Sequence, residues 1–141
     1  LLIGLATIKP QFGLLVPVAL LATASWRTII AAGGAAVALA GLAALAFGPQ
    51  VWSDWLAVTS AAGEATDNGT IGFAKMVSLF AGLRLLGVAS TPAIVAQVAL
   101  ALAVAGAVGA VAWRKPFSPG LAALVLAGAP LATPFVLDYD L

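Results

Sequence analysis

Lys9 is a charged side chain inside the apolar run 1–24, which makes it the first candidate for chemistry. If this run enters a membrane, an ammonium near mid-depth costs about 3 kcal/mol on insertion scales, and such residues are usually functional. One interpretation is structural: the lysine satisfies carbonyls at a helix break and reaches toward the surface. The other is a phosphate contact, because lysine is a compact point charge and a helix starting at Pro10 would add N–H groups. Thr7 and Gln11 could then donate neutral hydrogen bonds to the same ligand.

Asp138 and Asp140 form the second candidate group, on either side of Tyr139. Residues two apart do not share a helix face, so their spacing alone does not make an acid–base pair. They are either solvated charges at a helix end or part of a loop at the mouth of a site. In that loop they would bind a sugar hydroxyl or position a cation.

Lys75 and Arg84 are the third group, within a short stretch of helical periodicity over 73–86. Lys75 shares a helix face with Ser78 and Gly82, whereas Arg84 falls on the other face. We predict an interfacial helix here, whose cations meet either anionic headgroups in general or one lipid phosphate. Amphipathicity does not explain the position of Arg84.

The composition indicates a membrane protein. Of the 141 residues, 63% are hydrophobic and 8% charged, with a mean hydropathy of +1.15, whereas soluble domains carry about 25% charged residues. A net charge of +1 argues against nucleic acid as a partner and leaves the lipid bilayer as the expected one. Because cysteine and histidine are absent, we predict no disulfide, no metal site and no cofactor. The chain opens in an apolar run without Met, so we expect a fragment of a longer protein.

The expected fold is all-α, a polytopic transmembrane bundle with about three full spans in one domain, 1–141. The spans are predicted over 28–47, 93–113 and 118–137, each about long enough to cross a bilayer. Short broken helices are expected around Lys9-Pro10-Gln11, with a helix over 12–24 that Pro17 kinks. The stretch 49–92 is predicted as an outer loop, with 63–69 irregular and the interfacial helix over 73–86.

Local residue types set the ends of these elements. Gly48-Pro49 should stop the first span, Thr91-Pro92 should supply an N-cap followed by proline, and Ser118-Pro119 should begin the last span. Small residues four apart indicate close helix packing, as in Ala36/Ala40/Ala44, Ala105/Gly109 and Gly106/Ala110.

The cations predict the orientation in the membrane. Arg27 lies in one tight turn, and Arg114 with Lys115 in another, and both turns fall on the same side when the spans alternate. Because short cytoplasmic loops are enriched in Lys and Arg, these turns should be cytoplasmic. The 49–92 region, Lys9 and Asp138 should therefore face outward.

An ordered set of short motifs resembles glycosyltransferase family 87 over nearly the whole chain. The set comprises Ala6-Thr7-Ile8-Lys9-Pro10-Gln11-Phe12-Gly13-Leu14-Leu15, Trp26-Arg27, Phe47-Gly48-Pro49 with Trp52, Leu86-Gly87 before a span bearing Gln97, and the closing Leu131-Ala132-Thr133-Pro134-Phe135-Val136-Leu137-Asp138-Tyr139-Asp140-Leu141. The family usually has Ser-Pro-Tyr or a similar triplet before Asp-Tyr-Asp, so Thr133-Pro134-Phe135 is a mild departure.

The resemblance implies a mannosyltransferase of the GT-C fold, which moves a hexose from a polyprenyl-phosphate carrier to a glycan or glycolipid acceptor outside the bacterial plasma membrane. The general-base aspartate of such an enzyme would precede this stretch of chain, so we assign no catalytic residue here and expect the fragment alone to be inactive. The leaving lipid phosphate would need cations. Lys9 is the first candidate contact, with Gln11 beside it, and Arg84 and Lys75 are secondary candidates. Asp138 and Asp140 would belong to the same substrate site.

Two other functions fit the residues. A multi-pass transporter or flippase could use Lys9 and the broken helices to line a substrate path. A membrane scaffold without catalysis would account only for the alanine-rich faces.

Overall fold

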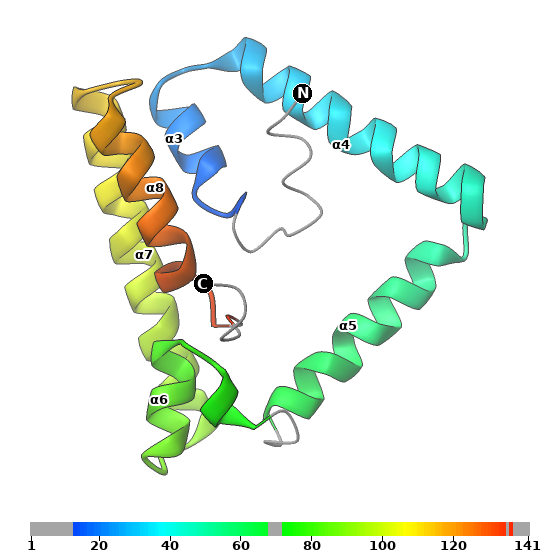
Figure 1. Ribbon diagram of the computed structural model, residues 1–141, viewed down its shortest axis with the longest axis vertical. Helices are drawn as coiled ribbons and strands as arrows, with labels where there is room; N and C mark the ends of the chain where they lie inside the picture. Colours follow the sequence, from blue (N-terminus) through cyan, green and yellow to red (C-terminus); the bar gives the residue numbers. More distant parts are fainter. Residues whose placement is uncertain (1–12, 68–71, 135, 137–141) are drawn as a thin grey trace.

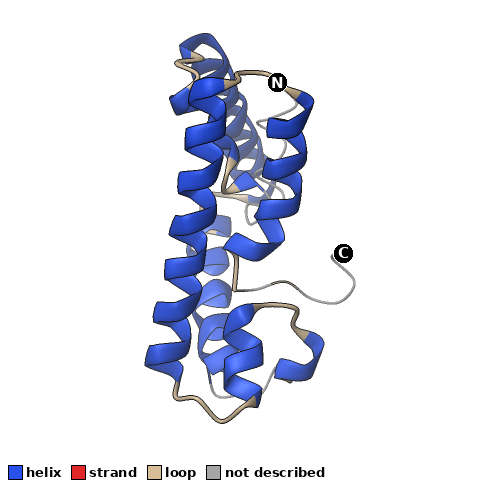
Figure 2. Ribbon diagram, turned by 90° about the vertical axis from the view of Figure 1, so that its left-hand side faces the viewer, coloured by secondary structure: helices blue, strands red, loops and turns tan. Residues whose placement is uncertain are grey.

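The computed structural model describes residues 13–67, 72–134 and 136, and every regular element in these ranges is helical (Figure 2). The elements are α3 (Val16–Ala22), α4 (Trp26–Phe47), α5 (Val51–Asp67), the 3-10 turn η2 (Phe73–Lys75), α6 (Leu79–Leu85), α7 (Ser90–Arg114) and α8 (Pro119–Ala132). Helices α7 and α8 lie side by side with α3 against α7, while α4 and α5 leave this group and form an open frame (Figure 1). The predicted all-α class is confirmed for the described part of the chain.

Among the described residues, two helices are long and apolar enough to cross a membrane. Helix α4 has 22 residues and α7 has 25, with mean hydropathies of 2.2 and 2.3 over their most apolar windows. At 1.5 Å per residue these helices are about 33 and 37 Å long, and a hydrocarbon core is about 30 Å thick. Their bounds agree with the spans predicted over 28–47 and 93–113.

The third predicted span is shorter than expected. Helix α8 has 14 residues and ends at Ala132, so at about 1.5 Å per residue it measures about 21 Å rather than the length of a full crossing. Thr133 is extended, with φ −107° and ψ 138°. The residue before a proline is driven out of the α conformation, and Pro134 follows Thr133, so the helix stops there. Pro130, by contrast, lies within the helix.

The predicted signals for helix starts and ends are confirmed at two of the three places. Gly48 ends α4 with φ +88°, a conformation that side chains disfavour, and the Ser118 hydroxyl accepts the Leu121 N–H at 3.1 Å at the start of α8. Thr91 is not an N-cap, because α7 already begins at Ser90 after Ala89. Pro92 still lies in the first turn, where its missing N–H has no intrahelical partner to lose.

In the described part of the segment expected to be helical over 12–24, the helix α3 runs from Val16 to Ala22. Pro17 lies in its first turn, so it starts this helix instead of kinking it. The predicted break at Lys9-Pro10-Gln11 lies outside the described residues.

The 49–92 region is more helical than predicted. Helix α5 covers 17 residues and includes Gly63 and Glu64, which we had expected in a loop. At 100° per residue, Trp52, Trp55 and Leu56 share one face of α5, and Asp54 lies near the opposite face. The continuous helix expected over 73–86 is instead divided into η2 and α6, because Ser78 is extended and caps α6 by accepting the Ala81 N–H at 3.1 Å.

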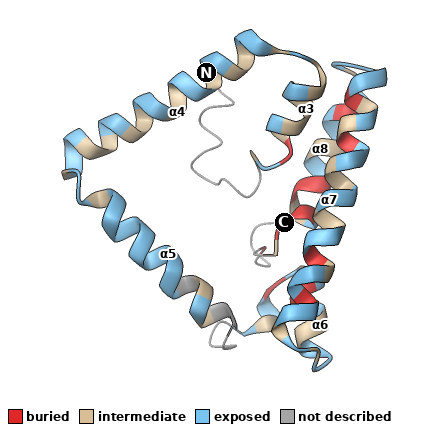
Figure 3. Cartoon of the chain, turned by 180° about the vertical axis from the view of Figure 1, so that it is seen from behind, coloured by how far each residue is buried: buried red, intermediate tan, exposed pale blue. Residues whose placement is uncertain are grey.

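The buried core lies between α3, α7 and α8, where Figure 3 concentrates the buried residues. Leu15, Val108 and Leu121 form its centre. Gly128 permits the close approach of α8, because a Cβ there would lie 2.7 Å from Val104 Cγ1 and 2.9 Å from Leu15 Cδ1. A Cβ on Gly109 would lie 3.8 Å from Val18, so this small residue faces α3 as its spacing suggested.

Helix α4 has no buried residue, so its small-residue stripe at Ala36, Ala40 and Ala44 is not packed into a core of the described ranges. Its side chains are left for lipid or for helices elsewhere in the protein.

Candidate functional site

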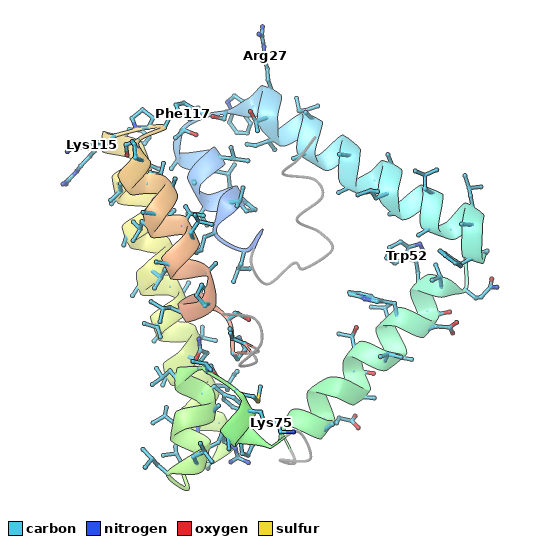
Figure 4. The ribbon with its side chains drawn as sticks, viewed as in Figure 1. Arg27, Trp52, Lys75, Lys115 and Phe117 are labelled. Carbon is cyan, nitrogen blue, oxygen red and sulfur yellow. The ribbon has the colours of Figure 1, made fainter. Side chains whose placement is uncertain are left out.

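The structure describes two of the six predicted site residues. Lys75 and Arg84 lie in the η2–α6 segment, beside the start of α7, whereas Lys9, Gln11, Asp138 and Asp140 lie outside the described residues. In Figure 4, Lys75 lies at the opposite end of the long axis from Arg27 and Lys115. The two cationic turns therefore share one end of the molecule, as their placement on one side of a membrane requires.

Arg84 is held in place by the chain that follows it. Its Nη1 donates to the carbonyl oxygen of Val88 at 3.1 Å, and its Cζ lies 5.2 Å from the centre of the Phe73 ring. Both contacts are within the usual range for a hydrogen bond and for a cation–π interaction. Gly87, with φ +84°, allows the chain to turn so that Val88 returns to the guanidinium. The position of Arg84 off the polar face is thereby explained, since it packs inward on Phe73.

An aromatic pair, one ring of which is buried, supports this arginine. Phe73 meets Phe80 edge to face, with ring centres 6.1 Å apart and planes at 75°. Phe80 is buried, whereas Arg84 is half-buried and Lys75 is exposed. Arg84 therefore has a fixed position while keeping access to the outside, and Lys75 is a freer charge on the same segment.

Gln97 connects this segment to the rest of the bundle. Its side chain is 1% exposed; Oε1 accepts the Phe80 N–H at 3.0 Å, and Nε2 donates to the Leu131 carbonyl at 2.9 Å. The first N–H groups and the last carbonyls of a helix lack intrahelical partners, and Gln97 supplies one to α6 and one to α8. Unsatisfied groups of this kind are costly in an apolar environment, so Gln97 fixes the relative position of three helices.

From the sequence, Gln97 was noted only as part of a motif, and this role was not predicted. A signal was present, because Gln97 is the one polar side chain between Ala93 and Ala112. A lone amide in an apolar span is expected to find partners on neighbouring helices.

The chain after α8 joins the same junction. The Val77 N–H donates to the Val136 carbonyl at 2.8 Å, and the Val136 side chain is fully buried. The segment 73–85, the start of α7 and residues 133, 134 and 136 therefore meet in one place, which we call the α6 junction. Asp138 follows Val136 by two residues in the sequence.

The described part of the junction offers positive charge on a rigid support, which suits an anion. No group of three or more His, Cys, Asp or Glu side chains within the described ranges could hold a metal ion. Arg84 presents a planar group that matches the oxygens of a phosphate, and Lys75 presents a mobile point charge.

The regular elements of the described residues are all helical, and two of them are long enough to span a membrane. Together with cations at the α6 junction, these features are typical of helical membrane proteins. In the comparison with family models, the model of glycosyltransferase family 87 matches residues 1–135. The chain belongs to glycosyltransferase family 87, and it is a membrane glycosyltransferase by that membership. Comparisons with curated proteins and with solved structures gave no significant match.

Proposed function

We propose that this chain forms the donor-phosphate side of a multi-pass glycosyltransferase that moves a hexose, mannose, from a polyprenyl-phosphate carrier to a glycan or glycolipid acceptor. The reaction takes place on the extracytoplasmic face of a bacterial plasma membrane. The observation that carries this proposal is the position of Arg84, a half-buried cation fixed on α6, and Figures 1 and 4 show α6 at the end of the bundle away from Arg27 and Lys115. Family membership supplies the reaction class.

The proposed reaction needs a cation near the leaving phosphate. When the sugar leaves its carrier, the bond between the anomeric carbon and the phosphate oxygen breaks, and negative charge develops on the phosphate. Donors that are already in position stabilise that charge at little reorganisation cost. Arg84 meets this condition because Phe73 and Val88 hold its guanidinium before any ligand arrives.

Lys75 adds a second charge to this site, and its exposure suits a carrier that enters from the bilayer. Lys9 and Gln11 complete the phosphate contacts in this proposal, while Asp138 and Asp140 contact the sugar or the acceptor. The general base belongs to a part of the enzyme that precedes these residues.

The orientation is inferred from charge. Arg27 and Lys115 lie at one end, with Arg114 next to Lys115 in the sequence, and cations in short turns favour the cytoplasm. The α6 junction at the other end then faces outward, where lipid-linked sugars are used.

A transporter or flippase is the second candidate, since a cation on a helical junction would also suit the path of a lipid phosphate. The family match over 1–135 favours the transferase over this candidate and over a scaffold.

The donor class can be tested with the purified full-length enzyme and a radiolabelled sugar. Label should move to acceptor from polyprenyl-phosphate mannose and should not move from a nucleotide-linked mannose. Transfer from the nucleotide sugar alone would overturn the proposed donor. Movement of the intact lipid-linked sugar across vesicles, with no transfer, would favour the flippase.

A further inference from the structure

An open hollow of about 480 Å³ lies at the turn between α7 and α8, at the end of the molecule away from the α6 junction. It is lined by Val111, Arg114, Lys115, Ser118, Gly120 and Leu124. None of these residues belongs to the proposed donor site.

The lining divides into a polar part and an apolar part. Arg114 and Lys115 bring two adjacent positive charges, both on exposed side chains. The Ser118 oxygen already accepts the Leu121 N–H at 3.1 Å, which leaves the hydroxyl hydrogen for an outside acceptor. Val111 and Leu124 form an apolar wall beside these groups. The hollow thus suits a molecule with an anionic head and a hydrocarbon tail.

Two exposed aromatic side chains lie close to Arg114 and Lys115 in the sequence. Trp113 is 79% exposed and Phe117 is 78% exposed. Phe117 has φ +58°, a strained conformation for a residue with a bulky side chain, so the turn presents this ring at an energetic cost. Figure 4 places Phe117 and Lys115 at the same end of the molecule as Arg27. Aromatic residues with cations beside them are typical of the headgroup level of a membrane.

We propose that this hollow binds the phosphate of an anionic phospholipid in the cytoplasmic leaflet. Arg114, Lys115 and Ser118 contact the phosphate, and an acyl chain lies along Val111 and Leu124. Free phosphate would contact only the polar part of the lining and leave Val111 and Leu124 exposed to water. An anionic phospholipid contacts both parts, so it is the ligand that fits the lining better. The inference rests on the membrane placement of the chain but not on its transferase activity.

The test is native mass spectrometry of the full-length protein, released from detergent after incubation with equal amounts of phosphatidylglycerol and phosphatidylcholine. The wild type should retain phosphatidylglycerol about tenfold more than phosphatidylcholine, since each surface cation favours anionic lipid. The double variant R114Q/K115Q should bring the two lipids close to parity. Arg27→Gln, which removes a cation from the same end but outside the hollow, should keep the preference.

Parity in the wild type, or equal losses in R114Q/K115Q and R27Q, would overturn the site. Melting of each variant is followed in parallel, and because Arg114 and Lys115 are exposed, an unchanged midpoint is expected. Leu124→Gln supplies a second test, because it leaves both cations in place and should weaken retention of the lipid if the acyl chain lies on that wall. Failure of these tests with normal transfer from lipid-linked sugar would reject the lipid site and leave the proposed function intact.

Discussion

The side-chain oxygen of Gln97 accepts the main-chain N–H of Phe80 at 3.0 Å, across 17 positions of sequence. Phe80 in turn packs on Phe73, and Phe73 carries the guanidinium of Arg84 on its ring. A buried amide on a span-length helix is thereby linked to this cation through two aromatic rings. The proposed donor site depends on this series of contacts.

Gln97→Leu should destabilise the protein, because it leaves the Phe80 N–H and the Leu131 carbonyl without the partners they now have. A buried polar group left unsatisfied costs about 1–3 kcal/mol. We expect a lower unfolding midpoint and a lower turnover than in Val98→Leu, a substitution at the neighbouring, half-exposed position. The two variants are compared by thermal unfolding in detergent. Equal stability of both would show that Gln97 is not the connection between α6 and α8.

Gly128→Ala should loosen the contact of α8 with α7 and α3. The added methyl would lie 2.7 Å from Val104 Cγ1 and 2.9 Å from Leu15 Cδ1, so side chains must move, and overpacking of this kind costs about 1–3 kcal/mol.

Gly106→Ala is the matched control on α7, since a Cβ there meets nothing within 4 Å. It should be neutral or slightly stabilising, as alanine favours a helix over glycine. If both alanine variants unfold at the same temperature, the close approach at Gly128 is not a determinant of packing.

The orientation predicts which positions an impermeant thiol reagent can reach in intact cells. A cysteine at Ala74, exposed beside Lys75, should react, and one at Lys115 should not until the membrane is opened. Neither position competes with a natural cysteine of this chain, which has none. The reverse pattern would place the α6 junction in the cytoplasm and remove the basis for a reaction outside.

Features that depend on neighbours in sequence were predictable here. Gly48 stops α4 and Ser118 caps α8, because each acts on the backbone within a few residues of itself. The two long spans follow in the same way from uninterrupted apolar runs. The predicted bounds were wrong where two local signals opposed each other. The apolar run after Ser118 favoured a full span, but the conformational restriction that Pro134 places on Thr133 ended the helix early.

Features that depend on distant partners were not predictable from the pattern. The partners of Gln97 lie 17 and 34 positions away, and nothing in its immediate neighbours indicates them. On a helical wheel, Arg84 falls off the polar face, and nothing in its helix explains that position. The explanation is its contacts with Phe73 in the preceding turn and Val88 in the following one. Lys9, Gln11, Asp138 and Asp140 remain predictions.

The most direct test of the donor-phosphate site is steady-state transfer by the full-length enzyme carrying Arg84→Gln, with polyprenyl-phosphate mannose as donor. If Arg84 stabilises the leaving phosphate, turnover at saturating donor should fall about 100-fold or more, with Arg84→Lys intermediate because it keeps the charge but loses the planar geometry. Arg27→Gln, at the opposite end, should transfer normally. Wild-type turnover in a folded Arg84→Gln enzyme would contradict the assignment, and Arg84 would then serve only to pack the α6 junction.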